Sequence, residues 1–197
     1  MIPLNVPNLL TVLRILLVPA LLAALLANTA AGDVLAAVVF AVASATDFLD
    51  GRIARARADE TTFGRLMDPL ADKLLVIAAL LALVSLHRLA AWVAMVIIAR
   101  ELAVTVLRLG AGAGAGAVIG ASLLGKLKTA VQIGVILTAI AVRSHPLWLS
   151  ALIYVMVALT VISGLDYFFG LRRHLARAQR RREQGLSRPP APATPRG

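Results

Sequence analysis

Long apolar stretches separated by short polar segments make up most of the chain. A helix needs about 20 apolar residues to cross the roughly 30 Å hydrocarbon core of a bilayer. Six stretches reach or approach that length, at residues 9–28, 33–53, 66–86, 89–109, 124–142 and 147–170. The pattern therefore predicts an all-α integral membrane protein with six transmembrane helices.

The segment after the sixth stretch differs sharply in composition from the rest of the chain. Residues 171–197 contain eight arginines and four prolines. We therefore expect a transmembrane domain of residues 1–170, which carries the chemistry, and a basic Arg/Pro-rich cytoplasmic tail of residues 171–197. Two interpretations of the tail are open: a disordered segment, or a helix over residues 171–183 that continues from the sixth stretch and lies on anionic headgroups.

The composition excludes several other classes of protein. Hydrophobic residues make up 60% of the 197 residues and charged residues only 15%, whereas a soluble domain is about half apolar and a quarter charged. Because the chain has no cysteine, a disulfide scaffold and a cysteine-ligated metal site are excluded. The net charge of +10 in so apolar a chain indicates membrane topology and attraction to anionic lipids, and we expect no nucleic-acid partner.

Lysine and arginine lie mainly on one side of the predicted spans. Sixteen of them fall in the tail and in the second and fourth connections with their flanks, against two, Arg88 and Arg143, on the other side. Basic connections stay in the cytoplasm, so both termini should be cytoplasmic. The high alanine and arginine content suggests a bacterial source, and we expect a multi-pass protein of the bacterial cell (inner) membrane.

Four of the ten acidic residues lie near the cytoplasmic ends of the second and third predicted spans. Asp47 and Asp50 are three residues apart and Asp68 and Asp72 are four apart, so each pair shares a helix face. A short loop joins the two helices, so all four carboxylates can converge just inside the membrane surface. Carboxylates within a membrane are costly and usually mark function.

Converging carboxylates repel one another at low dielectric, so they need compensating charge. One interpretation pairs them with basic neighbours, namely Arg52, Arg55, Arg65 and Lys73. A second interpretation places cations between them, and ligation by oxygen alone suits Mg²⁺, Mn²⁺ or Ca²⁺. We favour the second, because four acids on two helices exceed what simple ion pairs require. Two metals about 4 Å apart, bridged by carboxylates, would form a clamp for phosphoryl chemistry.

The residues around these aspartates form a longer pattern. Residues 47–72 read D-x2-D-G-x2-A-R-x8-G-x3-D-x3-D, and at every fixed position they resemble the signature of the CDP-alcohol phosphotransferase family. The resemblance implies a six-helix transmembrane bundle, a homodimer, a divalent-metal site at the cytoplasmic face and the exchange of CMP for an alcohol. Weaker similarity, to members that use glycerol 3-phosphate as the alcohol, extends the resemblance over residues 3–170. It lies in residues 7–14, 99–102, 125–132 and 162–168.

The resemblance also assigns roles to the four aspartates. Asp47 and Asp68 resemble ligands that bridge two divalent cations, Mg²⁺ or Mn²⁺, while Asp50 resembles a ligand of the first and Asp72 a ligand of the second. Asp72 also resembles the general base, which takes the proton of the acceptor hydroxyl as that oxygen attacks the β-phosphorus of CDP-diacylglycerol. CMP then leaves, and this direct displacement needs no Ser, Cys or His nucleophile.

Further residues are candidates for binding the CDP-lipid. Gly51 and Ala54 add no bulk beside the acids, and Arg55 can contact a pyrophosphate through both arms of its guanidinium. Arg14 lies in an apolar stretch and needs a partner, the diphosphate or a motif aspartate, unless it snorkels to the interface. The full set of candidates is Asn8, Thr11, Arg14, Gly51, Ala54, Arg55, Thr61 and Gly64.

Glycerol 3-phosphate, the acceptor implied by the resemblance, is a small dianion that needs cations close to the metals. The candidates lie at the cytoplasmic ends of the fourth and fifth predicted spans: Arg100, Arg108, Lys126 and Lys128. Lys126 and Lys128 are two residues apart and cannot share a helix face, so we expect at most one of them to point inward. Membrane topology alone would also explain these charges. Glu101 could orient Arg100 or meet an acceptor hydroxyl.

Other functions stay open on the sequence. The same chemistry with another acceptor would use inositol phosphate, or phosphatidylglycerol to give cardiolipin, and a lipid acceptor would not need the cation cluster. A divalent-cation transporter would place acids near the bilayer midplane and on both membrane halves, whereas here the motif acids lie toward one face.

Several features lie away from the motif. Trp92 and Trp148 are expected as aromatic anchors at the outer membrane surface. Asp166, deep in the sixth stretch, could pair with an arginine, and its role stays open. Residues 110–117 read GAGAGAGA, follow no strand and precede no Lys-Ser/Thr pair, so they predict a flexible connection rather than a phosphate-binding loop.

Overall fold

The described part of the chain forms six helices. The computed structural model describes residues 6–57, 62–115, 123–144 and 146–186, with side chains described at residues 12–46, 73–107, 125–144, 146–170 and 172. The helices are α1 (Val6–Leu26), α2 (Ala30–Arg57), α3 (Thr62–Ser85), α4 (Ala91–Ala115), α5 (Leu123–Ala141) and α6 (Leu147–Leu186). Each corresponds to one predicted apolar stretch, and the described ranges contain no strand. The all-α prediction is therefore confirmed.

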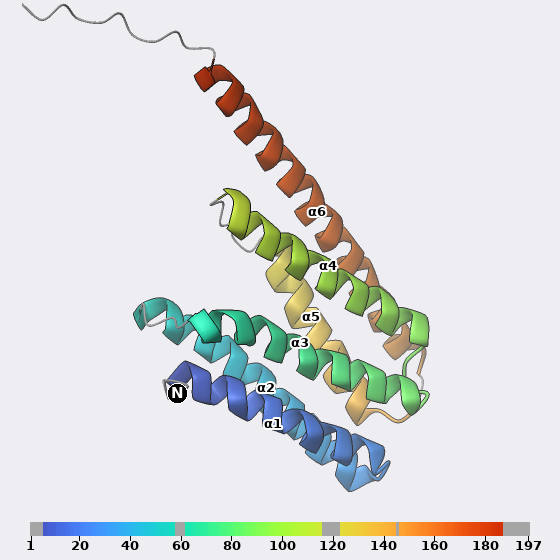
Figure 1. The fold of residues 1–197 in the computed structure, drawn as a ribbon. Coiled ribbons are helices and arrows are strands. Elements are labelled where there is room, and N and C mark those ends of the chain that lie inside the picture. The colour runs from blue at the N-terminus through green and yellow to red at the C-terminus, as the bar shows by residue number, and fades with distance from the viewer. Residues whose placement is uncertain (1–5, 58–61, 116–122, 145, 187–197) are drawn as a thin grey trace, which may run out of the picture.

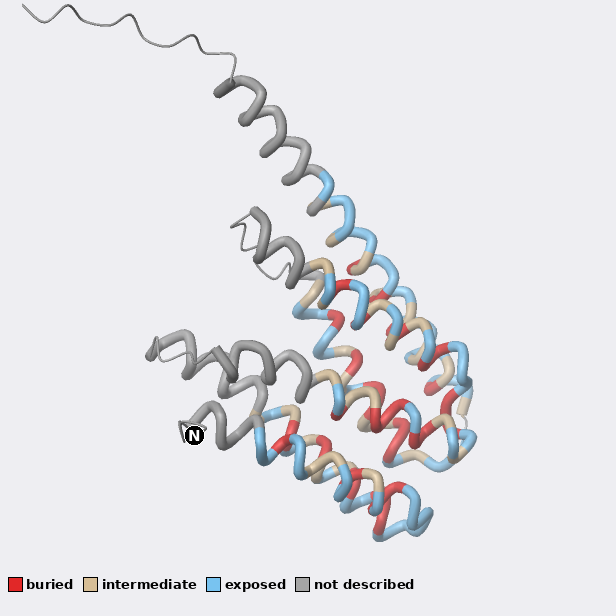
Figure 2. The backbone as a smooth tube through the Cα atoms, viewed as in Figure 1, coloured by how far each residue is buried: buried red, intermediate tan, exposed pale blue. Residues whose placement is uncertain are grey.

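The helices pack as two groups of three that meet along a common core (Figure 1). Helix α1 packs against α2 and α3, α6 packs against α4 and α5, and contacts of α2 with α5 and of α3 with α4 join the groups. Buried residues, red in Figure 2, lie where neighbouring helices come together, and most of them belong to one hydrophobic core. Their close packing holds the helices together through many small dispersion contacts. The largest of them include Leu21, Phe40, Leu83, Ile97 and Ile136.

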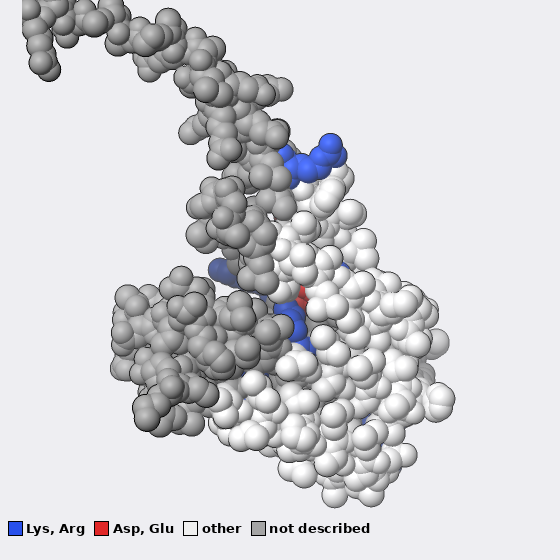
Figure 3. Space-filling model, in the orientation of Figure 1, with Lys and Arg blue, Asp and Glu red and all other residues white. Residues whose placement is uncertain are grey.

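On the face that Figure 3 shows, the described residues are largely uncharged, and basic and acidic atoms meet near the centre of the view. Many large hydrophobic side chains among the described residues are exposed, including Leu16, Val34 and Met95. Within the described ranges one stretch, Leu147–Gly170, is both long and apolar enough to cross a membrane. Shorter apolar stretches lie at Val12–Leu26, Ala30–Thr46 and Lys73–Ser85. The six-span topology stays a prediction.

Helices α4 and α6 run well past the ends that the sequence predicted. Helix α4 ends at Ala115, so the expectation of a flexible connection from residue 110 is wrong for residues 110–115; residues 116–122 lie outside the described ranges. Alternating alanine keeps this segment helical although each glycine costs about 1 kcal/mol relative to alanine. Helix α6 continues to Leu186, so residues 171–186 are helical, and the contact of this segment with anionic headgroups stays a prediction. Arginine is a good helix former, which favours this extension.

A network of ion pairs around the buried carboxylate of Asp33 links the ends of α2, α3 and α5 that are predicted to face the outside of the cell. The Oδ1 atom of Asp33 lies 3.0 Å from Nη1 of Arg88, and Nε of Arg143 donates to Oδ2 of Asp33 at 2.6 Å. The Arg88 guanidinium also donates to the Ile140 carbonyl and to the Asn28 side chain, at 3.0 and 3.1 Å. The sequence analysis counted Arg88 and Arg143 only for topology, whereas in the structure they also lock the bundle.

Candidate active site

The motif aspartates lie on two helices, as the spacing predicted. Asp47 and Asp50 belong to α2 and Asp68 and Asp72 to α3, and both helices stay regular through these positions. Each pair therefore shares one face of its helix. The side chains of these residues and of several other candidates lie outside the described residues, and their roles stay predictions. These are Asn8, Thr11, Asp47, Asp50, Gly51, Ala54, Arg55, Gly64, Asp68, Asp72 and Arg108, together with the whole of Thr61.

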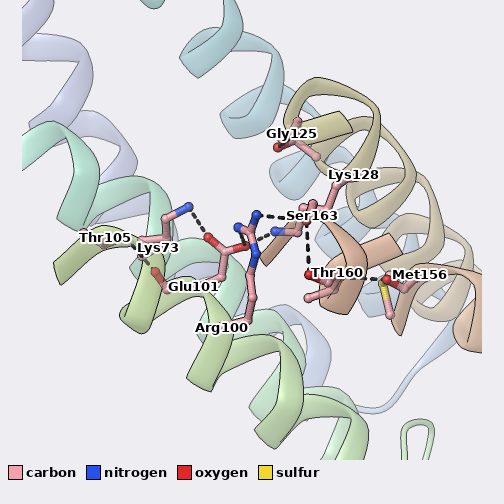
Figure 4. Close-up of polar contacts among 10 residues, drawn as sticks. Lys73, Arg100, Glu101, Thr105, Gly125, Lys128, Met156, Thr160 and Ser163 are labelled. Carbon is pink, nitrogen blue, oxygen red and sulfur yellow. Dashed lines mark hydrogen bonds and ion pairs between the residues drawn. The ribbon is translucent and has the colours of Figure 1, made fainter. Parts of the chain in front are cut away.

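A cluster of charged side chains lies immediately beyond the motif, and we call Lys73, Arg100, Glu101 and Lys128 the Glu101 cluster (Figure 4). Its centre is the carboxylate of Glu101 on α4, a residue that is only 2% exposed. The ammonium groups of Lys73 on α3 and Lys128 on α5 both contact this carboxylate. Nη1 of Arg100 lies 3.4 Å from Glu101 Oε1. One buried carboxylate thus gathers three cations from three helices.

Helix α6 fixes the position of Arg100. Its Nη2 atom donates to the Ser163 hydroxyl at 2.9 Å, and that hydroxyl donates to the Thr160 carbonyl at 3.1 Å. Gly164 leaves room for the Arg100 side chain, because a Cβ atom there would lie 3.2 Å from Arg100 Cγ. The Glu101 cluster therefore joins four helices, α3 to α6, through polar contacts within a mostly apolar bundle.

The structure separates the two candidate lysines of α5. Lys128 is 4% exposed and belongs to the Glu101 cluster, whereas Lys126 is exposed. The prediction that at most one of them points inward is confirmed, and the reason is their spacing of two residues on a helix. Arg100 is also in the cluster, so two of the four predicted acceptor-binding residues, Arg100 and Lys128, come together. The side chain of Arg108 lies outside the described residues.

Lys73 has a role that the sequence analysis missed. It was considered only as a counter-charge for the motif aspartates, but its ammonium group contacts Glu101 on the next helix. The available signal was that both residues are charged and lie inside apolar stretches, where an ionisable group needs a partner. Because Lys73 and Glu101 are far apart in the chain, the sequence did not show that they would be partners.

The structure excludes one of the two alternatives for Arg14 and does not show the pairing suggested for Asp166. Arg14 on α1 is 3% exposed, so its guanidinium does not snorkel to the surface of the bundle. Asp166 on α6 is exposed, and the ion pairs among the described residues do not include it. The suggested pairing of Asp166 with an arginine is therefore not found in this part of the chain.

The aromatic residues predicted as membrane anchors are both exposed. Trp92 on α4 stacks against Tyr154 on α6, with ring centroids 6.1 Å apart and planes inclined by 28°. Trp148 is half-exposed near the start of α6. The Trp92–Tyr154 pair lines a pocket of about 570 Å³ that also includes His87, Arg88 and Ser150. This pocket lies at the N-terminal end of α4, whereas Glu101 lies further along that helix.

Comparisons with known proteins agree on one chemistry. A family model described as CDP-alcohol phosphatidyltransferase matches residues 4–162. The chain is 41% identical over 182 residues to the CDP-diacylglycerol–glycerol-3-phosphate 3-phosphatidyltransferase of Bacillus subtilis, a match covering 83% of this chain and 93% of that protein. It is 44% identical over 168 residues to a probable phosphatidylglycerophosphate synthase of Mycobacterium tuberculosis, covering 83% and 79% of the two chains. A Salmonella choleraesuis protein with the same name as the first is 36% identical over 179 residues, covering 87% and 97%.

Proposed function

The chain belongs to the CDP-alcohol phosphatidyltransferase family, and from this premise we propose that it transfers the phosphatidyl group of CDP-diacylglycerol to glycerol 3-phosphate. The products are phosphatidylglycerol phosphate and CMP. The observation that carries the proposal is that relatives named for this reaction match 83% and 87% of the chain at 41% and 36% identity. The family match includes the whole Asp motif at residues 47–72.

The Glu101 cluster supports a phosphate-bearing acceptor. Lys73, Arg100 and Lys128 supply ammonium and guanidinium donors, which form strong charge-assisted hydrogen bonds to phosphate oxygens. Lys73 directly follows Asp72 in α3, so these donors lie close to the residue proposed as the base. Phosphatidylglycerol presents a phosphodiester with a single charge and would make less use of such a cluster.

Two divalent cations, Mg²⁺ or Mn²⁺, are proposed to bind Asp47, Asp50, Asp68 and Asp72. The donor set fits them, because four carboxylates on regular helices offer only hard oxygen ligands. When bound, such cations neutralise the charge of the diphosphate and the charge that develops on the departing CMP.

Side chains of the protein perform the remaining steps of the transfer: substrate binding, orientation and proton removal. Arg14 and Arg55 bind the diphosphate, and Gly51 and Ala54 let it approach α2. The acceptor phosphate is held by the cations of the Glu101 cluster, which turns the acceptor hydroxyl toward the diphosphate. The carboxylate of Asp72 takes the hydroxyl proton as the oxygen forms a bond to the β-phosphorus. The bond from that phosphorus to the oxygen of CMP breaks, and CMP leaves with the electron pair.

The protein is proposed to be a homodimer that crosses the bacterial cell membrane six times. Both termini and the active site would face the cytoplasm. Support comes from the distribution of lysine and arginine along the chain and from the large exposed hydrophobic side chains of the bundle.

A panel of acceptors tests this function directly. Purified protein is mixed with CDP-diacylglycerol, Mg²⁺ and one labelled alcohol at a time, and the release of CMP is followed. Glycerol 3-phosphate should give CMP and a labelled lipid, while inositol phosphate and phosphatidylglycerol should give far less. CMP release with another alcohol and none with glycerol 3-phosphate would contradict the proposed acceptor.

A further inference from the structure

We propose that Glu101 is a positioning residue for the acceptor: its buried carboxylate assembles Lys73, Arg100 and Lys128 into one preorganised site for the phosphate group. The inference rests on the proposed function and extends it, because neither the relatives' names nor the family motif includes Glu101. Its basis is the geometry of the Glu101 cluster, in which one acid contacts cations from α3, α4 and α5.

Three cations lie close together around Glu101. Like charges held close together in a poorly solvated site repel one another strongly, so Lys73, Arg100 and Lys128 would move apart without an anion between them. Glu101 is almost fully buried, and Lys128 is only slightly more exposed. The carboxylate therefore sets where the positive charges lie before any substrate arrives, and binding then costs less ordering of long, flexible side chains.

Glu101 also affects the reaction through the helices that its contacts hold together. Its contact with Lys73 fixes the turn of α3 that begins with Asp72, the proposed base, relative to α4. Its contact with Lys128 fixes α5, and Arg100 carries the connection on to Ser163 of α6. Through these contacts, Glu101 fixes the position of the phosphate site relative to Asp72, the residue proposed to take the hydroxyl proton.

Gln132 provides an independent sign that a polar ligand belongs beside this cluster. It lies four residues after Lys128 on α5, so the two side chains share a helix face. Gln132 is 3% exposed, and its Oε1 atom has no hydrogen-bond partner among the described residues. A buried amide oxygen without a donor is costly, and a hydroxyl group of the bound alcohol could supply that donor.

The test replaces Glu101 with glutamine, which keeps the shape of the side chain and removes its charge. The KM for glycerol 3-phosphate should rise about 10-fold or more, since hydrogen bonds to charged groups are the strong ones. The KM for CDP-diacylglycerol should change little. A merely structural role would lower stability or kcat without this selective change in the acceptor KM. If Glu101→Gln does not fold, Glu101→Asp keeps the charge, and we expect it to fold with an acceptor KM raised several-fold.

Asp33→Asn is the matched control, because it also removes a buried carboxylate that contacts two cations, Arg88 and Arg143. It should lower the melting temperature and leave the acceptor KM unchanged. An unchanged acceptor KM in Glu101→Gln would overturn the inference. A lower KM would also overturn it, because Glu101 would then compete with the phosphate rather than assemble its site.

A binding measurement separates this inference from the proposed function. Inorganic phosphate, compared with chloride at equal ionic strength, should raise the melting temperature of the wild-type protein in detergent, and Glu101→Gln should lose that increase. If the wild-type protein shows the increase but releases no CMP with glycerol 3-phosphate, the proposed function fails and the inference stands. Equal stabilisation of both proteins by phosphate would overturn the inference whatever the activity.

Discussion

Glu101 and Asp33 each hold several cations with a single buried carboxylate. Glu101 contacts Lys73, Arg100 and Lys128, while Asp33 contacts two arginines elsewhere in the bundle. A buried carboxylate needs close cations and hydrogen bonds to replace its lost hydration, and removing one partner of such a pair costs about 3–5 kcal/mol. At the scale of single residues, these acids therefore define the positions of the basic side chains around them.

The two lysines at the start of α5 allow a matched comparison. Lys128→Met should raise the KM for glycerol 3-phosphate about 10-fold, because a charge-assisted hydrogen bond is worth about 1.5–3 kcal/mol. Lys126→Met removes the same charge from an exposed position and should have a clearly smaller effect. Steady-state kinetics with the acceptor varied checks both variants, and equal effects would mean that burial does not distinguish the two lysines.

Asp72→Asn tests the proposed base. Asparagine keeps the size of the side chain but cannot accept the hydroxyl proton, and loss of a positioned general base typically costs 10²- to 10⁴-fold in rate. We expect kcat to fall by about that factor while CDP-diacylglycerol still binds. CMP release and binding of a labelled CDP-lipid are the two measurements. A variant with a near-normal kcat would show that another group removes the proton.

At the scale of helices, the sequence predicted where the apolar stretches lie but not where every helix ends. All six helices begin within a few residues of the predicted stretches. Helices α2, α4 and α6 continue past the apolar residues to Arg57, Ala115 and Leu186. The reason is that backbone hydrogen bonds and the helix propensity of alanine and arginine continue a helix where hydropathy has already changed.

Helix α6 offers a test of how Arg100 is held. Gly164→Leu should displace Arg100, since even a Cβ atom there would lie 3.2 Å from its Cγ, and the acceptor KM should rise several-fold. Gly170→Leu on the same helix is the control, because a Cβ atom at Gly170 meets no atom within 4 Å. Acceptor kinetics on both variants check the prediction, which fails if the two substitutions have the same effect.

At the scale of the whole molecule, residues far apart in the chain meet in ways that spacing could not predict. Intrahelical spacing predicted that Lys126 and Lys128 would point in different directions. The partners of Glu101 and Asp33 come from other helices, and local patterns carry no information on which helices pack together. The sequence therefore identified Arg100 and Lys128 as candidates but not the roles of Lys73 and Asp33, because the packing of the helices determines how these charged residues are grouped.

The predicted orientation of the bundle can be tested because the chain contains no cysteine. A single reporter cysteine at Ser144, an exposed residue before α6, should react with a membrane-impermeant maleimide added to intact cells. A reporter at Ser187 in the tail should react only after the membrane is opened. Labelling in the opposite order would reverse the proposed topology, and labelling of both in intact cells would show that α6 does not cross the membrane.

The central claim is that four carboxylates on α2 and α3 hold divalent cations that enable transfer from CDP-diacylglycerol to glycerol 3-phosphate. The most direct measurement is CMP release by the purified protein after chelation and after re-addition of Mg²⁺ or Mn²⁺. We expect chelation to abolish the release and either cation to restore it in the wild-type protein but not in Asp68→Asn. Undiminished CMP release in the presence of the chelator would contradict the claim.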